Sequence, residues 1–149
     1  MRPPTSSMQH IGRVLSCDQH KITLQHTYIH SLEYNNEKGL LTVEDESAPS
    51  MTLPILNSRS ICQLWNVFYW YRDADDFLKS IKIPSGFTIF SNNSNPYSNN
   101  SPDQDKDIQI FPGTAYDLCE AIDKIKDSEN NLCVTNKDDV VRFWFCWKD

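Results

Sequence analysis

Histidine and cysteine side chains gather near the start of the chain, where they could bind a metal ion or act in catalysis. Cys17, His20, His26 and His30 fall within fourteen residues. The surrounding residues alternate between apolar and polar, which predicts a β-strand. Because four residues of a strand span about 13 Å, His26 and His30 would lie too far apart to share one zinc ion. We therefore expect no metal and no cofactor, and keep as an alternative a small hydrolase that uses His26 or His30 as general base.

An acidic run, DQDKD, begins like a calcium-binding loop but does not continue as one. Asp103, Asp105 and Asp107 have the right spacing. However, Ile108 stands where glycine is required and Thr114 where a bidentate glutamate belongs. The sequence also has no G-x-S-x-G nucleophile motif and no glycine-rich phosphate loop. These observations predict a protein that is not an enzyme, with no catalytic residue to name.

Large aromatic rings are concentrated in two segments, LWNVFYWY at residues 64–71 and VRFWFCW at residues 141–147. In a strand, each segment would carry rings on both faces. One face of each would be enough for a core, so the remaining rings are expected to contact another protein, as Tyr, Trp and Arg commonly do. The expected partner-binding residues are these rings, one arginine and the aspartates after the first segment: Trp65, Tyr69, Tyr71, Asp73, Asp75, Asp76, Arg142 and Trp144.

The charge of the chain indicates what kind of partner to expect. Its formal net charge is -6, from 20 acidic and 14 basic side chains. Nucleic-acid binding normally requires a basic surface, so single-strand binding through sheet aromatics is kept only as an alternative. Carboxylates at Glu44–Glu46 and Asp73–Asp76 would attract a basic surface. We expect a non-enzymatic protein that binds and neutralises a basic partner, such as an immunity protein, another inhibitor or a viral antagonist.

The cysteines and the N-terminus indicate the compartment. The chain has five cysteines and no CxxC pair, which predicts reduced thiols. The first residues, MRPPTSSMQHIGRV, contain no apolar run of the kind found in signal peptides. No segment has the apolar length of a membrane-spanning helix. We therefore expect a cytoplasmic protein that does not contact a membrane.

Strand patterns dominate the first half of the chain. Residues 20–34 alternate as one half-buried strand that bends or breaks somewhere, with Ile29 on the unexpected face. Asn36 and Gly39 mark a turn before a return strand. Residues 51–56 are expected to form a short strand, which Pro54 places at the edge of the sheet. An open edge there could pair with a second copy to form a homodimer.

Residues 61–71 fit a strand or a helix, and their aromatic content favours a strand. A short helix is expected next, with Asp73 as its N-cap. Strands GFTIF and IQIF follow. Thr114 and Asp117 predict the start of a helix that runs along AYDLCEAIDKIKD, with a Glu120–Lys124 pair on its wet side. NLCVT and VVRFWFCW predict a final hairpin.

Together these elements predict an α+β fold, with a mainly antiparallel sheet and two helices packed on one face. Residues 1–10 are expected to form a flexible arm and residues 11–149 a single domain. The Asn/Ser-rich segment at 91–107 is expected to be a mobile loop, because its composition cannot bury enough apolar surface.

Overall fold

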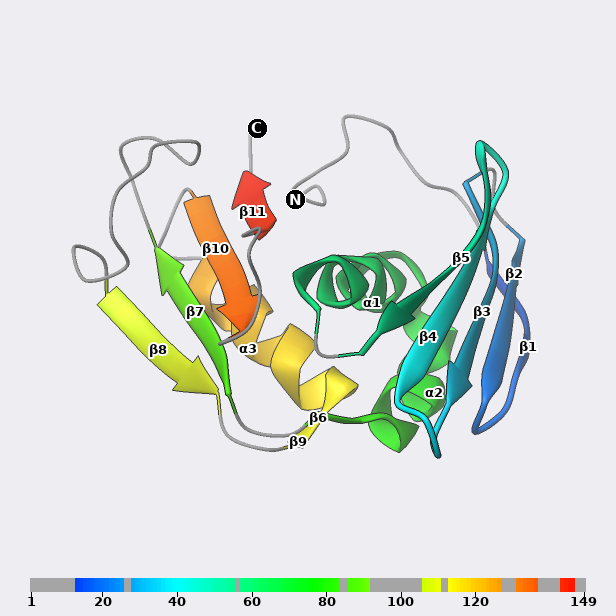
Figure 1. Ribbon diagram of the computed structural model, residues 1–149, viewed down its shortest axis with the longest axis horizontal. Helices are drawn as coiled ribbons and strands as arrows, with labels where there is room; N and C mark the ends of the chain where they lie inside the picture. The colour runs from blue at the N-terminus through cyan, green and yellow to red at the C-terminus, as the bar shows by residue number, and fades with distance from the viewer. Residues whose placement is uncertain are drawn as a thin grey trace.

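Three α-helices lie between two antiparallel β-sheets in the computed structural model of the chain (Figure 1). The predicted α+β class, in one domain with mainly antiparallel strands, is confirmed. The structure adds a third helix to the two expected, and divides the strands among separate sheets instead of placing them in one. It describes residues 13–25, 28–55, 57–83, 86–91, 106–110, 113–126, 131–136 and 143–146.

The first sheet has five strands in the order β1-β2-β3-β4-β5, and each neighbouring pair is antiparallel. Its two edges are therefore β1 and β5. Pro54 is the last residue of β5, and β5 is an edge strand. The prediction that the strand containing Pro54 lies at an edge of the sheet is therefore confirmed. The strands are β1 (Arg13–Cys17), β2 (Lys21–Gln25), β3 (Ile29–Asn35), β4 (Leu40–Asp45) and β5 (Ala48–Pro54).

The long alternating segment at residues 20–34 forms two antiparallel strands, β2 and β3, with a break between them. A bulge between Ile29 and Ser31 shifts the alternation at the start of β3. As a result Ile29 and Leu32 are both buried, although three positions separate them. This bulge explains why Ile29 did not fit the pattern of a single strand.

The predicted turn between β3 and β4 is confirmed. The backbone N–H of Gly39 donates to the carbonyl oxygen of Asn35 at 2.8 Å. The N–H of Lys38 donates to Oδ1 of the same asparagine at 3.0 Å. Gly39 has a φ of 66°, a left-handed conformation that glycine adopts without steric cost.

The second sheet has four strands in the order β11-β10-β7-β8, again with antiparallel neighbours. It confirms the predicted strands GFTIF and IQIF and the final hairpin. A separate two-stranded ribbon pairs β6 with β9. These strands are β6 (Lys82–Ile83), β7 (Phe87–Ser91), β8 (Lys106–Ile110), β9 (Gly113–Thr114), β10 (Asn131–Asn136) and β11 (Phe143–Cys146).

The loop expected at 91–107 is shorter at both ends than predicted. Ser91 belongs to β7, while Lys106 and Asp107 belong to β8. These two strands pair with each other, so their ladder extends into the segment that composition alone assigned to a loop. The rest of that loop and the N-terminal arm lie outside the described residues.

Residues 61–70 are helical and Tyr71 is the C-cap, so the prediction of a strand over residues 61–71 is wrong. Helix α1 (Ser58–Trp70) begins after Asn57, its N-cap. Oδ1 of Asn57 accepts hydrogen bonds from the backbone N–H groups of Arg59, at 2.7 Å, and Ser60, at 3.1 Å. No glycine or proline interrupts the helix. The cap and the apolar stripe therefore outweigh the strand propensity of the aromatic rings.

Both sheets pack against α1, which explains why its apolar residues are not confined to one face. The helix contacts β5 of the first sheet, β10 and β11 of the second, and its two neighbouring helices (Figure 1). Leu64, Trp65 and Val67 have no exposed surface. A helix that packs against neighbours on several sides in this way is typical of a protein interior.

A 3-10 helix, η1 (Arg72–Ala74), leads directly into α2 (Asp75–Ser80). Asp73, predicted to cap this helix, lies inside η1 instead, and the residue before α2 makes no side-chain capping bond. Asp75 and Asp76 lie in the first turn of α2, where they face the positive end of the helix dipole.

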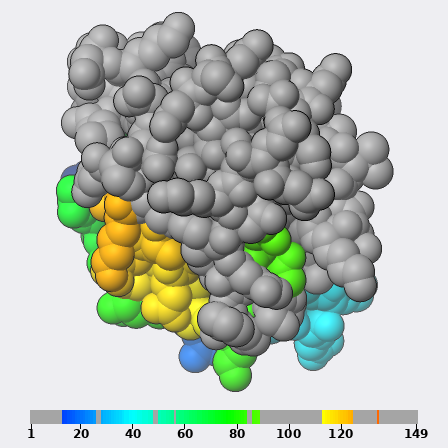
Figure 2. Space-filling model, turned by 90° about the vertical axis from the view of Figure 1, so that its left-hand side faces the viewer, coloured from blue at the N-terminus to red at the C-terminus, as the bar shows by residue number. Residues whose placement is uncertain are grey.

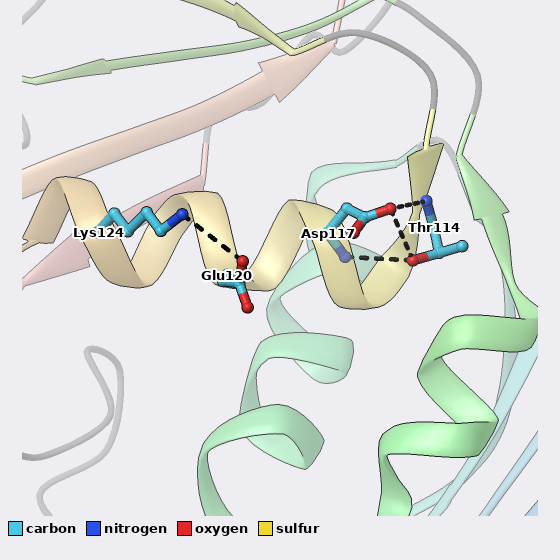
Figure 3. A network of polar contacts seen from close by, with 4 residues as sticks. All are labelled: Thr114, Asp117, Glu120 and Lys124. Atoms are coloured by element: carbon cyan, nitrogen blue, oxygen red, sulfur yellow. Dashed lines mark hydrogen bonds and ion pairs between the residues drawn. The ribbon is translucent and has the colours of Figure 1, made fainter.

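Helix α3 (Ala115–Lys126) begins at the predicted Thr114–Asp117 contact and carries the predicted Glu120–Lys124 ion pair (Figure 3). The N–H of Thr114 donates to Oδ2 of Asp117 at 3.0 Å, and the N–H of Asp117 donates to Oγ1 of Thr114 at 3.2 Å. This reciprocal pair satisfies amides that the helix itself leaves without acceptors. One turn further on, Nζ of Lys124 lies 3.6 Å from Oε1 of Glu120.

Replacing Asn57 with alanine should lower the free energy of unfolding by about 0.5–2 kcal/mol, because two amides of the first turn of α1 lose their acceptor. Urea unfolding followed by circular dichroism would measure the change. Asn57→Ser is the matched control, since serine keeps an acceptor and should remain close to the natural protein. Equal losses in the two variants would contradict a capping role.

Candidate functional site

Two of the expected partner-binding rings lie in the core. Trp65 is 0% exposed and Tyr71 is 2% exposed, so neither reaches the surface of the folded chain. Their proposed role as anchors is corrected to a packing role. The physical reason is that α1 carries Trp65 between two sheets and ends beside Tyr71, whereas a strand would have left one face uncovered. Burial raises the pKa of the Tyr71 phenol well above its usual value.

A cluster of partly buried rings lies where the C-terminal half of α1 meets the start of α3. The rings of Tyr69 and Trp70 meet edge to face, with 5.1 Å between their centroids. Phe68 and Tyr116 are 5.5 Å apart in the same type of arrangement. Nζ of Lys79 lies 4.7 Å from the centre of the Tyr116 ring, within the range of a cation–π contact. We call Phe68, Tyr69, Trp70 and Tyr116 the ring cluster.

Among the expected anchors, Tyr69 keeps part of its surface. Partial burial raises the pKa of its phenol, the negative charge of Asp123 raises it further, and Arg72 lowers it. The Tyr69 hydroxyl is therefore neutral at physiological pH and lies near charges of both signs. Helix α3, which carries Asp123, reaches the surface of the molecule, where its residues are yellow to orange in Figure 2.

Three exposed carboxylates from separate elements surround the end of β1. Asp18 directly follows β1, Asp73 lies in η1 and Asp76 lies in the first turn of α2. β1 packs against η1, which brings the first of these residues close to the other two although more than 50 positions separate them in the sequence. All three carboxylates act electrostatically on the thiol of Cys17. We call Asp18, Asp73 and Asp76 the acidic face.

Cys17 lies at the centre of the acidic face and contacts the start of α2. Partial burial raises the pKa of its thiol, and a hydrogen bond with the backbone of Phe77 lowers it. The carboxylates of the acidic face raise the pKa further. Phe77 is the third residue of α2, so Cys17 lies close to the start of this helix.

Asp18 is held in place by its own turn. Its Oδ1 accepts the N–H of His20 at 2.7 Å and the N–H of Lys21 at 2.8 Å. These hydrogen bonds, that of His20 first, hold the pKa of Asp18 below its usual value. The carboxylate is therefore ionised and fixed in direction. Asp75, also expected to bind the partner, is half-exposed in the first turn of α2.

The remaining predicted residues do not join the acidic face. Glu44–Glu46 lies in β4 and the turn after it, three strands away from β1. The N–H and Oγ of Ser47 both donate to Oδ1 of Asp45 at 2.8 Å, so this carboxylate stabilises the turn. Arg142 lies outside the described residues. The backbone of Trp144 pairs with Cys133 between β11 and β10.

The histidines that suggested chemistry are dispersed. His30 is exposed on β3, and His20 is exposed in the turn after β1, where Nδ2 of Asn36 lies 3.1 Å from its Nδ1. His26 lies outside the described residues. Within the described ranges, no group of three or more His, Cys, Asp or Glu side chains is arranged to hold a metal ion.

Sequence reasoning missed Asp18 and Cys17 as members of the site. A local signal for Asp18 existed, because an aspartate between two alternating runs is typical of a turn. Nothing local connected it with Asp73 and Asp76, since only the packing of β1 against η1 brings them together.

No protein-family model, curated protein or solved structure matches the chain. In the part of the chain that the structure describes, no helix has the length and apolar character needed to cross a membrane. The class of this protein is therefore described by its fold and its candidate site. It is an α+β protein with an acidic face beside an edge strand of its larger sheet.

Tyr71→Phe should reduce the loss of stability at alkaline pH. Below the usual tyrosine pKa of about 10, Tyr71 is neutral in both the folded and unfolded states and adds no pH dependence. Above it, the unfolded phenol ionises first, so up to about 1.4 kcal/mol of unfolding free energy is lost per pH unit. Urea unfolding at about pH 8 and about pH 11 would reveal the difference. The same alkaline loss in both proteins would contradict this account.

Asp73→Asn combined with Asp76→Asn should make Cys17 react faster with iodoacetamide, by about two- to threefold at a fixed pH near 8, because fewer negative charges oppose the thiolate. Peptide mass spectrometry can measure the rate at Cys17 separately from the other cysteines. Glu44→Gln with Glu46→Gln is a control with the same change in net charge. If this control accelerates the reaction equally, the acidic face does not act locally on the thiol.

Proposed function

We propose that this protein works by binding another protein through the acidic face, and that the partner presents a basic surface. The observation that carries the proposal is the meeting of Asp18, Asp73 and Asp76 from three separate elements around one point. The formal net charge of -6 adds a long-range field of the same sign. Such fields raise the rate of encounter with a basic partner and disfavour acidic ones.

The ring cluster supports the proposal because it can supply apolar contact area, and two of its rings lie close to Asp73 in the sequence. Tyr69 and Trp70 end α1, immediately before the η1 turn that carries Asp73. Both rings keep part of their surface and are held by contacts with each other. Partly exposed aromatic rings on a rigid helix are frequent anchors in protein interfaces.

Within this class we favour an inhibitor of the immunity-protein or viral-antagonist kind, which neutralises a basic toxin, nuclease or host factor by covering its cleft. The support is the acidic surface on a small domain, an analogy of type alone. A reducing, cytoplasmic location fits the same proposal. Cys17, Cys62 and Cys119 are not joined in disulfides, although Cys17 is exposed.

The test compares two variants that change the net charge equally. The first carries Asp18→Asn, Asp73→Asn and Asp76→Asn, and the second carries Glu33→Gln, Glu44→Gln and Glu46→Gln at exposed positions elsewhere on the first sheet. Natural protein immobilised on a resin should capture a stoichiometric basic partner from its source cells. We expect the first variant to bind that partner at least about tenfold more weakly, and the second to bind within about twofold of the natural protein.

Two outcomes would contradict the proposal. One is that no stoichiometric partner is captured by the natural protein. The other is that both variants lose binding to the same extent, because the effect would then reflect net charge and not the acidic face. Circular dichroism of each variant shows whether the fold is retained. We expect the Asp18→Asn variant to keep it, because asparagine still has an oxygen that can accept the two turn hydrogen bonds.

A further inference from the structure

The two edges of the first sheet differ in their capacity to accept another strand. β5 contains Pro49 and Pro54, which lack the backbone N–H that pairing uses. β1 contains no proline, and four of its five residues are exposed. Alternate N–H and C=O groups of an edge strand point away from the sheet. β1 is therefore the edge that can form hydrogen bonds to an added strand.

Leu15, in the middle of β1, gives this edge an exposed apolar side chain. It is 53% exposed, and it is the large hydrophobic side chain left at the surface in the part of the chain that the structure describes. Edge strands often carry a charge that discourages pairing, and in β1 this charge is Arg13, at the first position of the strand. In the middle of the strand, the aliphatic side chain of Leu15 instead offers apolar contact to a strand lying alongside.

The charges around β1 indicate what would lie there. Asp18 directly follows the strand, and Asp73 and Asp76 approach the same end of it. A lysine or arginine side chain on an added strand would find three carboxylates there. A second copy of this chain would instead bring the same carboxylates with it, and like charges repel.

A bulge in β1 also argues against self-association. The register with β2 shifts between Val14 and Ser16, so Leu15 is an extra residue of β1 that has no partner position on β2. Bulges make an edge a poor template for long, regular pairing. An added strand can then pair over a short stretch only, and its side-chain charges must supply much of the selectivity.

Building on the proposed function, we infer that the basic partner binds by an extended segment that adds to β1 as a sixth strand of the first sheet. Backbone hydrogen bonds to β1 supply affinity that does not depend on sequence. An apolar side chain of the segment packs on Leu15, and a lysine or arginine side chain reaches the acidic face. The partner is thus recognised by an extended, basic stretch and not by a helix.

The probe is a hexapeptide of alternating lysine and valine, and binding is followed by the backbone amide signals of β1 in NMR titrations. Leu15→Lys should weaken binding about fivefold or more, because it places a positive charge where the peptide must lie. Thr52→Lys makes the same charge change at an exposed position of the other edge strand, β5, and should leave binding within about twofold. Equal effects of the two substitutions would overturn the inference.

A second peptide tests the backbone hydrogen bonds directly. N-methylation of alternate amides keeps the charges but removes the ladder, so this peptide should bind at least about fivefold more weakly. The parent peptide should also slow hydrogen exchange in β1. If the N-methylated peptide binds as well as the parent, or exchange in β1 does not slow, strand addition is wrong. Partner capture that still depends on the acidic face would then leave the proposed function standing, whereas loss of that dependence would remove both.

Discussion

Burial of α1 between two sheets is the constraint on which the rest of the molecule depends. Each antiparallel sheet has one apolar face that must be covered, and one helix lies against both. Trp65 contributes the largest fully buried side chain of this layer, and its loss to alanine would cost about 3–5 kcal/mol by general experience with such residues. The helix therefore joins the two sheets through one interior layer.

This arrangement changes where a binding surface can lie. Aromatic rings at both faces of a strand would have left a broad apolar surface, whereas a central helix hides most of them. In the part of the chain that the structure describes, the ring cluster where α1 meets α3 and the charged turn that leads from α1 into α2 keep exposed surface. The proposed binding surface would thus be small in apolar area and would depend more on the carboxylates of η1, α2 and the end of β1.

Local chemistry in the sequence was sufficient to predict much of the fold. The cap formed by Thr114 and Asp117, the turn at Gly39 and the edge position of Pro54 follow from the conformations those residues favour, and each is confirmed. The error at residues 61–71 has a physical cause. The segment carries an apolar stripe at helical spacing, but its ring content was given more weight than this stripe, and the capping role of Asn57 was overlooked. The acidic face could not be predicted, because it requires the packing of β1 against η1.

Two carboxylates of the acidic face, those of Asp18 and Asp76, also have a role in the fold, and the two roles differ. Asp18 closes a turn, and Asp76 stabilises the start of a short helix. Neither role requires the two to lie near each other, since a turn and a helix start work equally well on opposite sides of a domain. All three carboxylates act on Cys17 and raise the pKa of its thiol, so the field at this place is negative. A negative field at the end of an edge strand attracts an oppositely charged surface, and neither the turn nor the helix start needs that field.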